Sequence, residues 1–241
     1  MPRRPLAAAA VFALLLSPSA PAETEEATRF EVHFGGLYAG RLTVALARDD
    51  DRYALRAQAR PANWVSALYR AGLTAEGEGA VAATPRPERF EVRARFGDDD
   101  QRVAVDWGPD GRPASVAAEP PFRPRPWQLD PSTQQGAVDP VAAAVRFLEP
   151  RAPEALCRET VEVFDGRRRT RVTLGAPEAH RGGWRCRGSW ERVAGFRPRD
   201  MRKKPVPVAV EFVPGPDGLA ELRQVEVDTG YGVALVRRAA D

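Results

Sequence analysis

The chain has 241 residues, and its 36 Lys or Arg against 33 Asp or Glu give a formal net charge of +3 at pH 7. After the N-terminal apolar run, no stretch approaches the roughly 20 apolar residues of a membrane-spanning helix, so no transmembrane segment is expected in the mature protein. The small net charge conceals an uneven distribution. Residues 151–204 contain 15 basic and 7 acidic residues, a difference of +8, whereas residues 23–150 contain 16 and 20, a difference of −4.

The N-terminus has the composition of a cleaved secretory signal peptide, over residues 1–22. Arg3 and Arg4 form a positive start, Leu6–Leu16 is apolar throughout, and residues 20–22 supply the small side chains of a cleavage site. As a helix this apolar run rises only about 16 Å, roughly half of a hydrocarbon core, which argues against a membrane anchor. We therefore expect a periplasmic protein, and export argues against nucleic acid as a partner.

Alternation of apolar and polar residues predicts strands along most of the remaining chain. In Arg29–Phe34 the apolar side chains fall on one face and the polar ones on the other, and Arg89–Phe96 repeats the pattern over eight residues. Shorter runs of the same kind are Leu42–Ala47, Tyr53–Arg60, Val103–Trp107, Thr160–Phe164, Thr170–Leu174, Val206–Val213, Leu222–Val227 and Val233–Val236. Because no long amphipathic helices separate these runs, an antiparallel sheet is expected rather than a parallel α/β one.

Glycines and acidic residues mark the turns. Gly35 and Gly36 follow the first strand, and because Arg41–Ala47 alternates like a strand, the glycines predict a hairpin rather than a phosphate-binding loop. Asp49–Asp51 and Asp98–Asp100 lack the spacing of a calcium loop and are interpreted as solvated hairpin tips.

Two short helices are expected. Asp139 is a good cap and Pro140 suits the first helical position, so a helix should run to Leu148 with one apolar face on the sheet. Asn63–Arg70 predicts a weaker helical turn. Glu119–Asp130, with four prolines, is interpreted as an extended crossover, so residues 23–241 should form a single domain.

Cys157 and Cys186 are the only cysteines, and an oxidising compartment would let them form a disulfide. Two buried free thiols are the alternative. We expect no catalytic, metal-binding or cofactor-binding residues: no serine lies in a nucleophile motif, and neither histidine has a ligand-type partner at i+2 or i+4.

Asp165 and Gly166 predict a hairpin turn, after which three arginines open the returning strand. Arg167 and Arg169 would share one face of that strand and are the candidate residues for contacting an anion, with Arg168 on the other face. A solvated arginine cluster is the simpler interpretation of the same residues.

The first strand ending in GGLYAG, the helix opening DPVAAA and the segment VFDGRRR between the two cysteines together resemble the DUF3108 family of exported bacterial proteins of unknown function. The resemblance extends over residues 29–238. It implies a large antiparallel sheet and carries no catalytic residues over to this chain.

The expected fold is therefore all-β and mainly antiparallel, a strongly curved sheet or open β-barrel with one short helix packed on it. We expect a non-enzymatic binding module for an apolar or amphipathic ligand of the cell envelope, such as a lipid. The alternative is a protein that docks on anionic polysaccharide or a partner protein through its arginine-rich half, and an uncharacterised hydrolase is the third hypothesis. An apolar cavity would favour the first of these, and a filled core the second.

Overall fold

A computed structural model of the protein describes residues 26–240, so the signal peptide expected at residues 1–22 lies outside the described part. These residues form one 13-stranded antiparallel sheet. The strands are β1 (Glu26–Phe34), β2 (Leu37–Arg48), β3 (Arg52–Pro61), β4 (Ala71–Ala80), β5 (Arg86–Phe96), β6 (Asp99–Trp107), β7 (Pro113–Glu119), β8 (Glu159–Phe164), β9 (Arg169–His180), β10 (Gly183–Ala194), β11 (Val206–Pro214), β12 (Ala220–Asp228) and β13 (Val233–Arg238).

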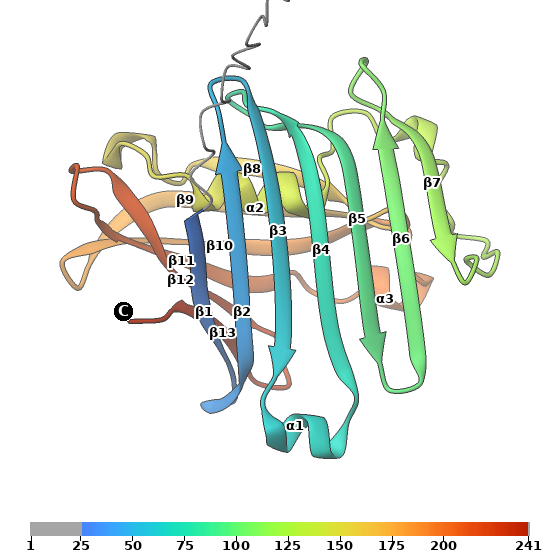
Figure 1. Cartoon of the computed structure of the whole chain (residues 1–241), viewed down its shortest axis with the longest axis horizontal. Coiled ribbons are helices and arrows are strands. Elements are labelled where there is room, and N and C mark those ends of the chain that lie inside the picture. Colours follow the sequence, from blue (N-terminus) through green and yellow to red (C-terminus); the bar gives the residue numbers. More distant parts are fainter. Residues whose placement is uncertain (1–25, 241) are drawn as a thin grey trace, which may run out of the picture.

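Strands β1 to β7 form one meander and β8 to β13 a second, and the two are joined through β1 and β13. In space the order is β7-β6-β5-β4-β3-β2-β1-β13-β12-β11-β10-β9-β8, so the first and last strands are neighbours in the middle of the sheet (Figure 1). Their register pairs Val32 with Val236 and Phe34 with Ala234. The mainly antiparallel all-β fold predicted from the alternation is confirmed. The sheet is not closed, because no ladder joins its edge strands β7 and β8.

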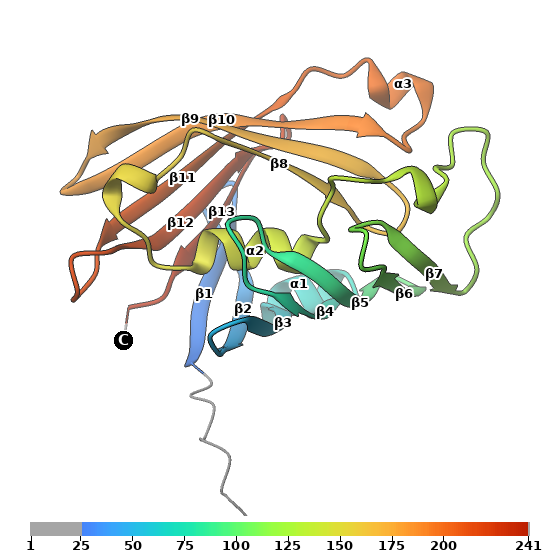
Figure 2. The same cartoon turned by 90° about the horizontal axis from the view of Figure 1, so that it is seen from above.

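The two halves of the sheet face each other across α2 (Figure 2). The other helical elements are α1 (Asn63–Leu68), α3 (Pro198–Met201) and the 3₁₀ turns η1 (Pro131–Thr133) and η2 (Pro153–Ala155). Helix α2 spans Pro140–Leu148 and contacts β4 and β5 of one half and β8 and β12 of the other. It begins where the sequence predicts, with the carboxylate of Asp139 accepting hydrogen bonds from the backbone N–H groups of Val141 and Ala142 at 2.7 and 2.8 Å.

Because α2 lies between two layers, it is buried on more than one face, and its small residues let both layers approach. A Cβ added to Gly77 of β4 would lie 2.8 Å from the Val141 side chain, so the strand needs glycine where the helix crosses it. Phe90, Val145 and Phe212 are each at most 1 % exposed and form the centre of the core around the helix.

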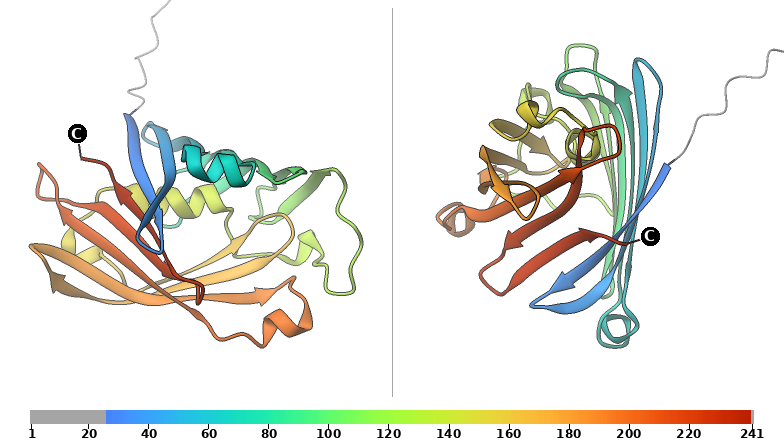
Figure 3. Two further views of the ribbon diagram at one scale, coloured as in Figure 1. Left: turned by 90° about the horizontal axis from the view of Figure 1, so that it is seen from below. Right: turned by 90° about the vertical axis from the view of Figure 1, so that its left-hand side faces the viewer.

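The two edges of the sheet also contact each other, although no ladder joins them. A Cβ on Gly166, in the turn between β8 and β9, would lie 2.7 Å from Val103 and 3.2 Å from Val105 of β6. Figure 3 shows this turn lying against the β6–β7 side of the molecule. The contact holds the arginine-bearing turn against the Pro-rich crossover that follows β7.

Candidate functional site

The interior cavities beside α2 are small. One of about 120 Å³ lies between β1, β2, β12 and the end of α2, and is bordered by Phe30, Leu148 and Leu222. Another, of about 90 Å³, lies between α2 and β8. Both volumes are below the roughly 300–1,000 Å³ typical of small-molecule pockets.

A larger hollow, of about 740 Å³, lies on the outer surface of β3 to β7, and six of its lining residues are charged. Three of the four lining arginines pair with carboxylates, whereas Arg60 has no ion pair in the described part of the chain. Glu91 accepts hydrogen bonds from Arg93 at 3.1 Å and Arg102 at 2.7 Å, and these arginines hold its pKa low, at about 2. Arg95 pairs with Asp100 at 2.7 Å. Such pairing of exposed charges is typical of a solvated sheet face.

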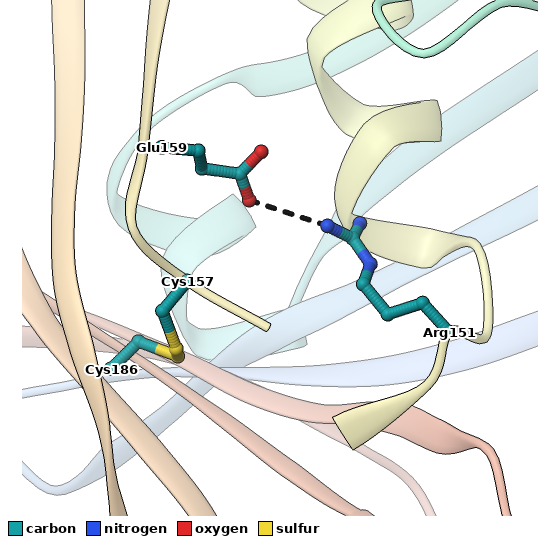
Figure 4. The surroundings of a disulfide bond; sticks show 4 residues. All are labelled: Arg151, Cys157, Glu159 and Cys186. Carbon is teal, nitrogen blue, oxygen red and sulfur yellow. Dashed lines mark hydrogen bonds and ion pairs between the residues drawn. A yellow bond between two sulfur atoms is a disulfide. The ribbon is translucent and has the colours of Figure 1, made fainter. Parts of the chain in front are cut away.

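Cys157 and Cys186 are joined in a disulfide, as the sequence predicts, with their Cα atoms 5.7 Å apart (Figure 4). Beside it lies a half-buried charge cluster. Glu159 accepts hydrogen bonds from Arg146 at 2.8 Å and Arg151 at 3.3 Å. Burial lowers the pKa of Arg151, against the opposing effect of Glu159. This group ties the chain after α2 to the start of β8, so its role is structural.

The two candidate anion-contacting arginines are placed differently. The side chain of Arg169 donates to Glu162, and to the backbone carbonyl of Gln135 at 3.1 Å, so a carboxylate already neutralises it. Within residues 26–240 the guanidinium of Arg167 has no such partner, and it lies 5.1 Å from the ring centroid of Phe122. The turn itself has four residues, 165–168, so the face alternation expected for Arg167 and Arg168 does not apply there.

One end of the sheet carries a row of exposed apolar side chains. Within residues 26–240, eleven large apolar residues are exposed; Met201 and Leu219 lie elsewhere, and nine lie in this row. We call these nine the aromatic rim: Phe34, Leu37, Tyr38, Trp64, Leu68, Tyr69, Phe96, Tyr231 and Val233. Leu68 is 80 % exposed and Tyr231 92 % exposed, so these side chains reach far into solvent.

The aromatic rim is continuous because four connections end side by side. They are the β1–β2 and β12–β13 hairpins, α1, and the β5–β6 hairpin, along the lower edge in Figure 1. The ring of Phe34 lies 3.5 Å from the Cβ position of Gly232, between β12 and β13. The indole of Trp64 donates to the backbone carbonyl of Tyr38 at 2.7 Å, and the Tyr69 ring lies 3.3 Å from the Cβ position of Gly97, between β5 and β6.

Local sequence explains why the rim is exposed. Gly35 and Gly36 have φ of +56° and +84°, which lets β1 turn tightly into β2 and pushes Leu37 outward. Helix α1 has no buried residue, so neither Trp64 nor Leu68 contributes to the core. In the sequence, Leu37 is recognisable only as part of the GGLYAG hairpin. The signal that points to the rim is the clustering of aromatic and leucine residues at turns, where polar residues are usual.

Charges beside the rim have both signs. Arg70 follows the rim residue Tyr69, and Arg95 precedes Phe96, whereas Asp98 lies in the β5–β6 turn and Asp99 begins β6. Because these charges largely offset one another, the rim offers apolar area rather than a net electric field.

Among residues 26–240, no helix is long and apolar enough to cross a membrane. The same residues contain no group of three or more His, Cys, Asp or Glu side chains arranged to hold a metal ion.

Residues 29–177 match the family DUF3108, described as a protein of unknown function. The chain belongs to DUF3108. The match covers β1 through most of β9 and therefore includes the GGLYAG hairpin, α2 and the turn with the three arginines, and it confirms the resemblance drawn from those motifs. Neither the curated proteins nor the solved structures include a match to this DUF3108 chain.

Proposed function

We propose that this DUF3108 protein is an exported, non-enzymatic interaction protein that docks on a lipid bilayer surface of the cell envelope through its aromatic rim. One observation carries the proposal: nine of the eleven exposed large apolar side chains of residues 26–240 form one row at one end of the sheet. An exposed apolar row of this kind marks an interaction surface.

The chemistry of the rim suits a bilayer surface. Trp and Tyr are enriched where membranes meet water, because their rings are apolar and their tips polar. The indole N–H of Trp64 is already bonded to Tyr38, so inserting the ring leaves no donor unpaired. The backbone N–H groups of Gly35 and Gly97 at the tips are also bonded, to the carbonyls of Val233 and Arg70. These bonds lower the desolvation cost of insertion.

The small size of the interior cavities also supports docking through the rim. A lipid carrier would need an apolar cavity, whereas a peripheral membrane protein needs only an apolar edge. The core around α2 leaves small cavities, and the apolar side chains that remain exposed are concentrated at the rim. The amphipathic ligand expected from the sequence is therefore proposed to be the bilayer surface itself.

Replacing two rim leucines tests this proposal. Burying a leucine contributes about 1.5–3 kcal/mol. We therefore expect the double variant Leu37→Ser/Leu68→Ser to bind neutral phosphatidylcholine vesicles roughly 100-fold more weakly than the wild type, in a co-sedimentation assay. Since the rim carries little net charge, wild-type binding to these vesicles should change little between low and high salt.

The matched control is Met201→Ser/Leu219→Ser, which removes the two exposed large apolar side chains outside the rim. It should bind neutral vesicles like the wild type. A wild-type protein that does not bind these vesicles, or a rim variant that binds them as well as the control does, would refute docking through the rim.

A further inference from the structure

A group of arginines converges where the two edges of the sheet meet, away from the rim. The turn between β8 and β9 lies against the loop after β10, because a Cβ on Gly195 would be 2.6 Å from the Arg167 carbonyl. The crossover after β7 reaches the same place, where Phe122 lies beneath Arg167. We call the guanidinium-bearing residues gathered here the arginine cluster: Arg125, Arg167, Arg168, Arg192 and Arg197.

Aromatic rings hold three of these guanidinium groups. Arg167 lies 5.1 Å from the Phe122 ring centroid, and Arg168 5.2 Å from that of Phe196. Arg192 lies 4.9 Å from the Trp190 ring and 5.9 Å from the same Phe196 ring. Stacking on a ring fixes the plane of a guanidinium while its N–H edge stays available for hydrogen bonds. The donors are thus positioned before any ligand arrives.

The arginine cluster has no carboxylate partner in the described part of the chain, whereas Arg169, Arg171 and Arg185 all form ion pairs. Burial lowers the pKa of Arg167, and Arg168, Arg125 and Arg197 lower it further, which shows that like charges face one another here.

The nearest acidic groups are already engaged. Asp165, which opposes the lowering of the Arg167 pKa, accepts the backbone N–H groups of Arg167 and Arg168 at 2.8 and 2.7 Å. Asp200 pairs with Lys203 at 2.8 Å. The cluster therefore keeps an uncompensated positive charge.

We propose that the arginine cluster binds a phosphate group carried by a small molecule or a lipid headgroup. A group with more than one negative charge relieves the repulsion among several arginines better than a single carboxylate does. The guanidinium fork also matches phosphate oxygens in bidentate fashion. This site does not depend on the aromatic rim. It replaces the pair Arg167 and Arg169 expected from the sequence by Arg167 with Arg168, one arginine of β10 and two arginines of other loops.

The test is calorimetric titration of the full chain with inorganic pyrophosphate at low salt. The wild type should bind, and added salt should weaken binding. We expect Arg167→Gln/Arg168→Gln to reduce the affinity by roughly tenfold or more, because two charged hydrogen-bond donors are lost. The matched control, Arg89→Gln/Arg187→Gln, removes two exposed arginines elsewhere on the sheet and should bind like the wild type.

Two further arms identify the source of the phosphate. Binding of glycerol 3-phosphate supports a soluble phosphorylated ligand. If the wild type binds vesicles containing phosphatidylglycerol more tightly than neutral vesicles, and Arg167→Gln/Arg168→Gln loses this difference, the ligand is a lipid headgroup. Arg167→Lys/Arg168→Lys keeps the charge and the fold while removing the fork, and should bind pyrophosphate with intermediate affinity. A wild type that does not bind pyrophosphate, or an equal loss in the Arg89 and Arg187 control, overturns the proposal. Neutral vesicles report on the rim alone, so the two proposals can fail separately.

Discussion

Raising the pH from about 4 to about 7 is expected to remove about 4 kcal/mol of folding free energy through one carboxyl group, that of Asp139. Asp139 is fully buried at the start of α2, and burial raises its pKa from 3.8 to about 7, against the opposing effect of its two backbone hydrogen bonds. The folded state therefore holds the proton more tightly than the unfolded state. The stabilisation is complete below about pH 4 and is lost as the pH rises to about 7.

The surroundings of Asp139 explain why its charge is unfavourable. One carboxylate oxygen caps the helix, and the other has no hydrogen-bond partner among residues 26–240. The buried hydroxyl of Tyr53 also lacks a partner, and its pKa is raised by burial and then by the charge of Asp139. No arginine is among the groups that shift the pKa of Asp139.

The variant Asp139→Asn isolates this effect, because asparagine can accept the same capping hydrogen bonds but does not ionise. Urea unfolding at pH 5 and pH 8 should show a clear loss of wild-type stability at pH 8 that the variant does not share. Other carboxylates contribute equally to both proteins and cancel in the comparison. Parallel pH profiles for wild type and variant would show that Asp139 is not the group responsible.

Breaking the disulfide is the second change with a large expected effect. Cys157 and Cys186 are 29 residues apart, and closing a loop of that length stabilises a fold by about 3–4 kcal/mol in the chain-entropy model. The double variant Cys157→Ser/Cys186→Ser should therefore melt roughly 10 °C below the wild type.

We expect the loss of stability to arise from the segment around the disulfide. The bond joins the segment before β8 to β10, and Cys157 and Arg158 hold left-handed φ values of 60° and 50° that non-glycine residues rarely adopt. Thiol titration of the denatured wild type should find no reactive cysteine. Two reactive thiols per chain, or equal melting temperatures of wild type and double variant, would contradict a stabilising disulfide.

The sequence predicts most strands because their alternation records which face is buried. It does not predict β4, whose sequence AGLTAEGEGA is rich in residues that disfavour strands. The structure supplies the reason: Gly77 makes room for α2, and a Cβ on Gly79 would lie 2.1 Å from the Arg86 carbonyl. Strand β10 was missed for a similar reason, since Gly188 sits where its register with β9 shifts. Gly77 and Gly188 are required by residues elsewhere in the chain, Val141 and Thr173, which the local sequence does not reveal.

The helix α2 is predicted well because its cap, Asp139, and its first residue, Pro140, are local signals. Its setting between two layers is not local and could not be predicted from the sequence. The same holds for both candidate sites. The rim depends on four turns ending together, and the arginine cluster on three loops converging, so only Arg167 could be singled out from the sequence.

The most direct test of docking through the rim is the fluorescence of Trp64 on vesicles whose lipid chains carry bromine, which quenches nearby tryptophan. Trp64 lies in the rim, whereas Trp107 is buried in the core and Trp190 lies beside the arginine cluster. We predict that part of the wild-type fluorescence is quenched on binding, and that Trp64→Phe still binds but loses the quenched component. Equal quenching in Trp64→Phe, or bound wild-type protein without quenching, would contradict insertion of the rim.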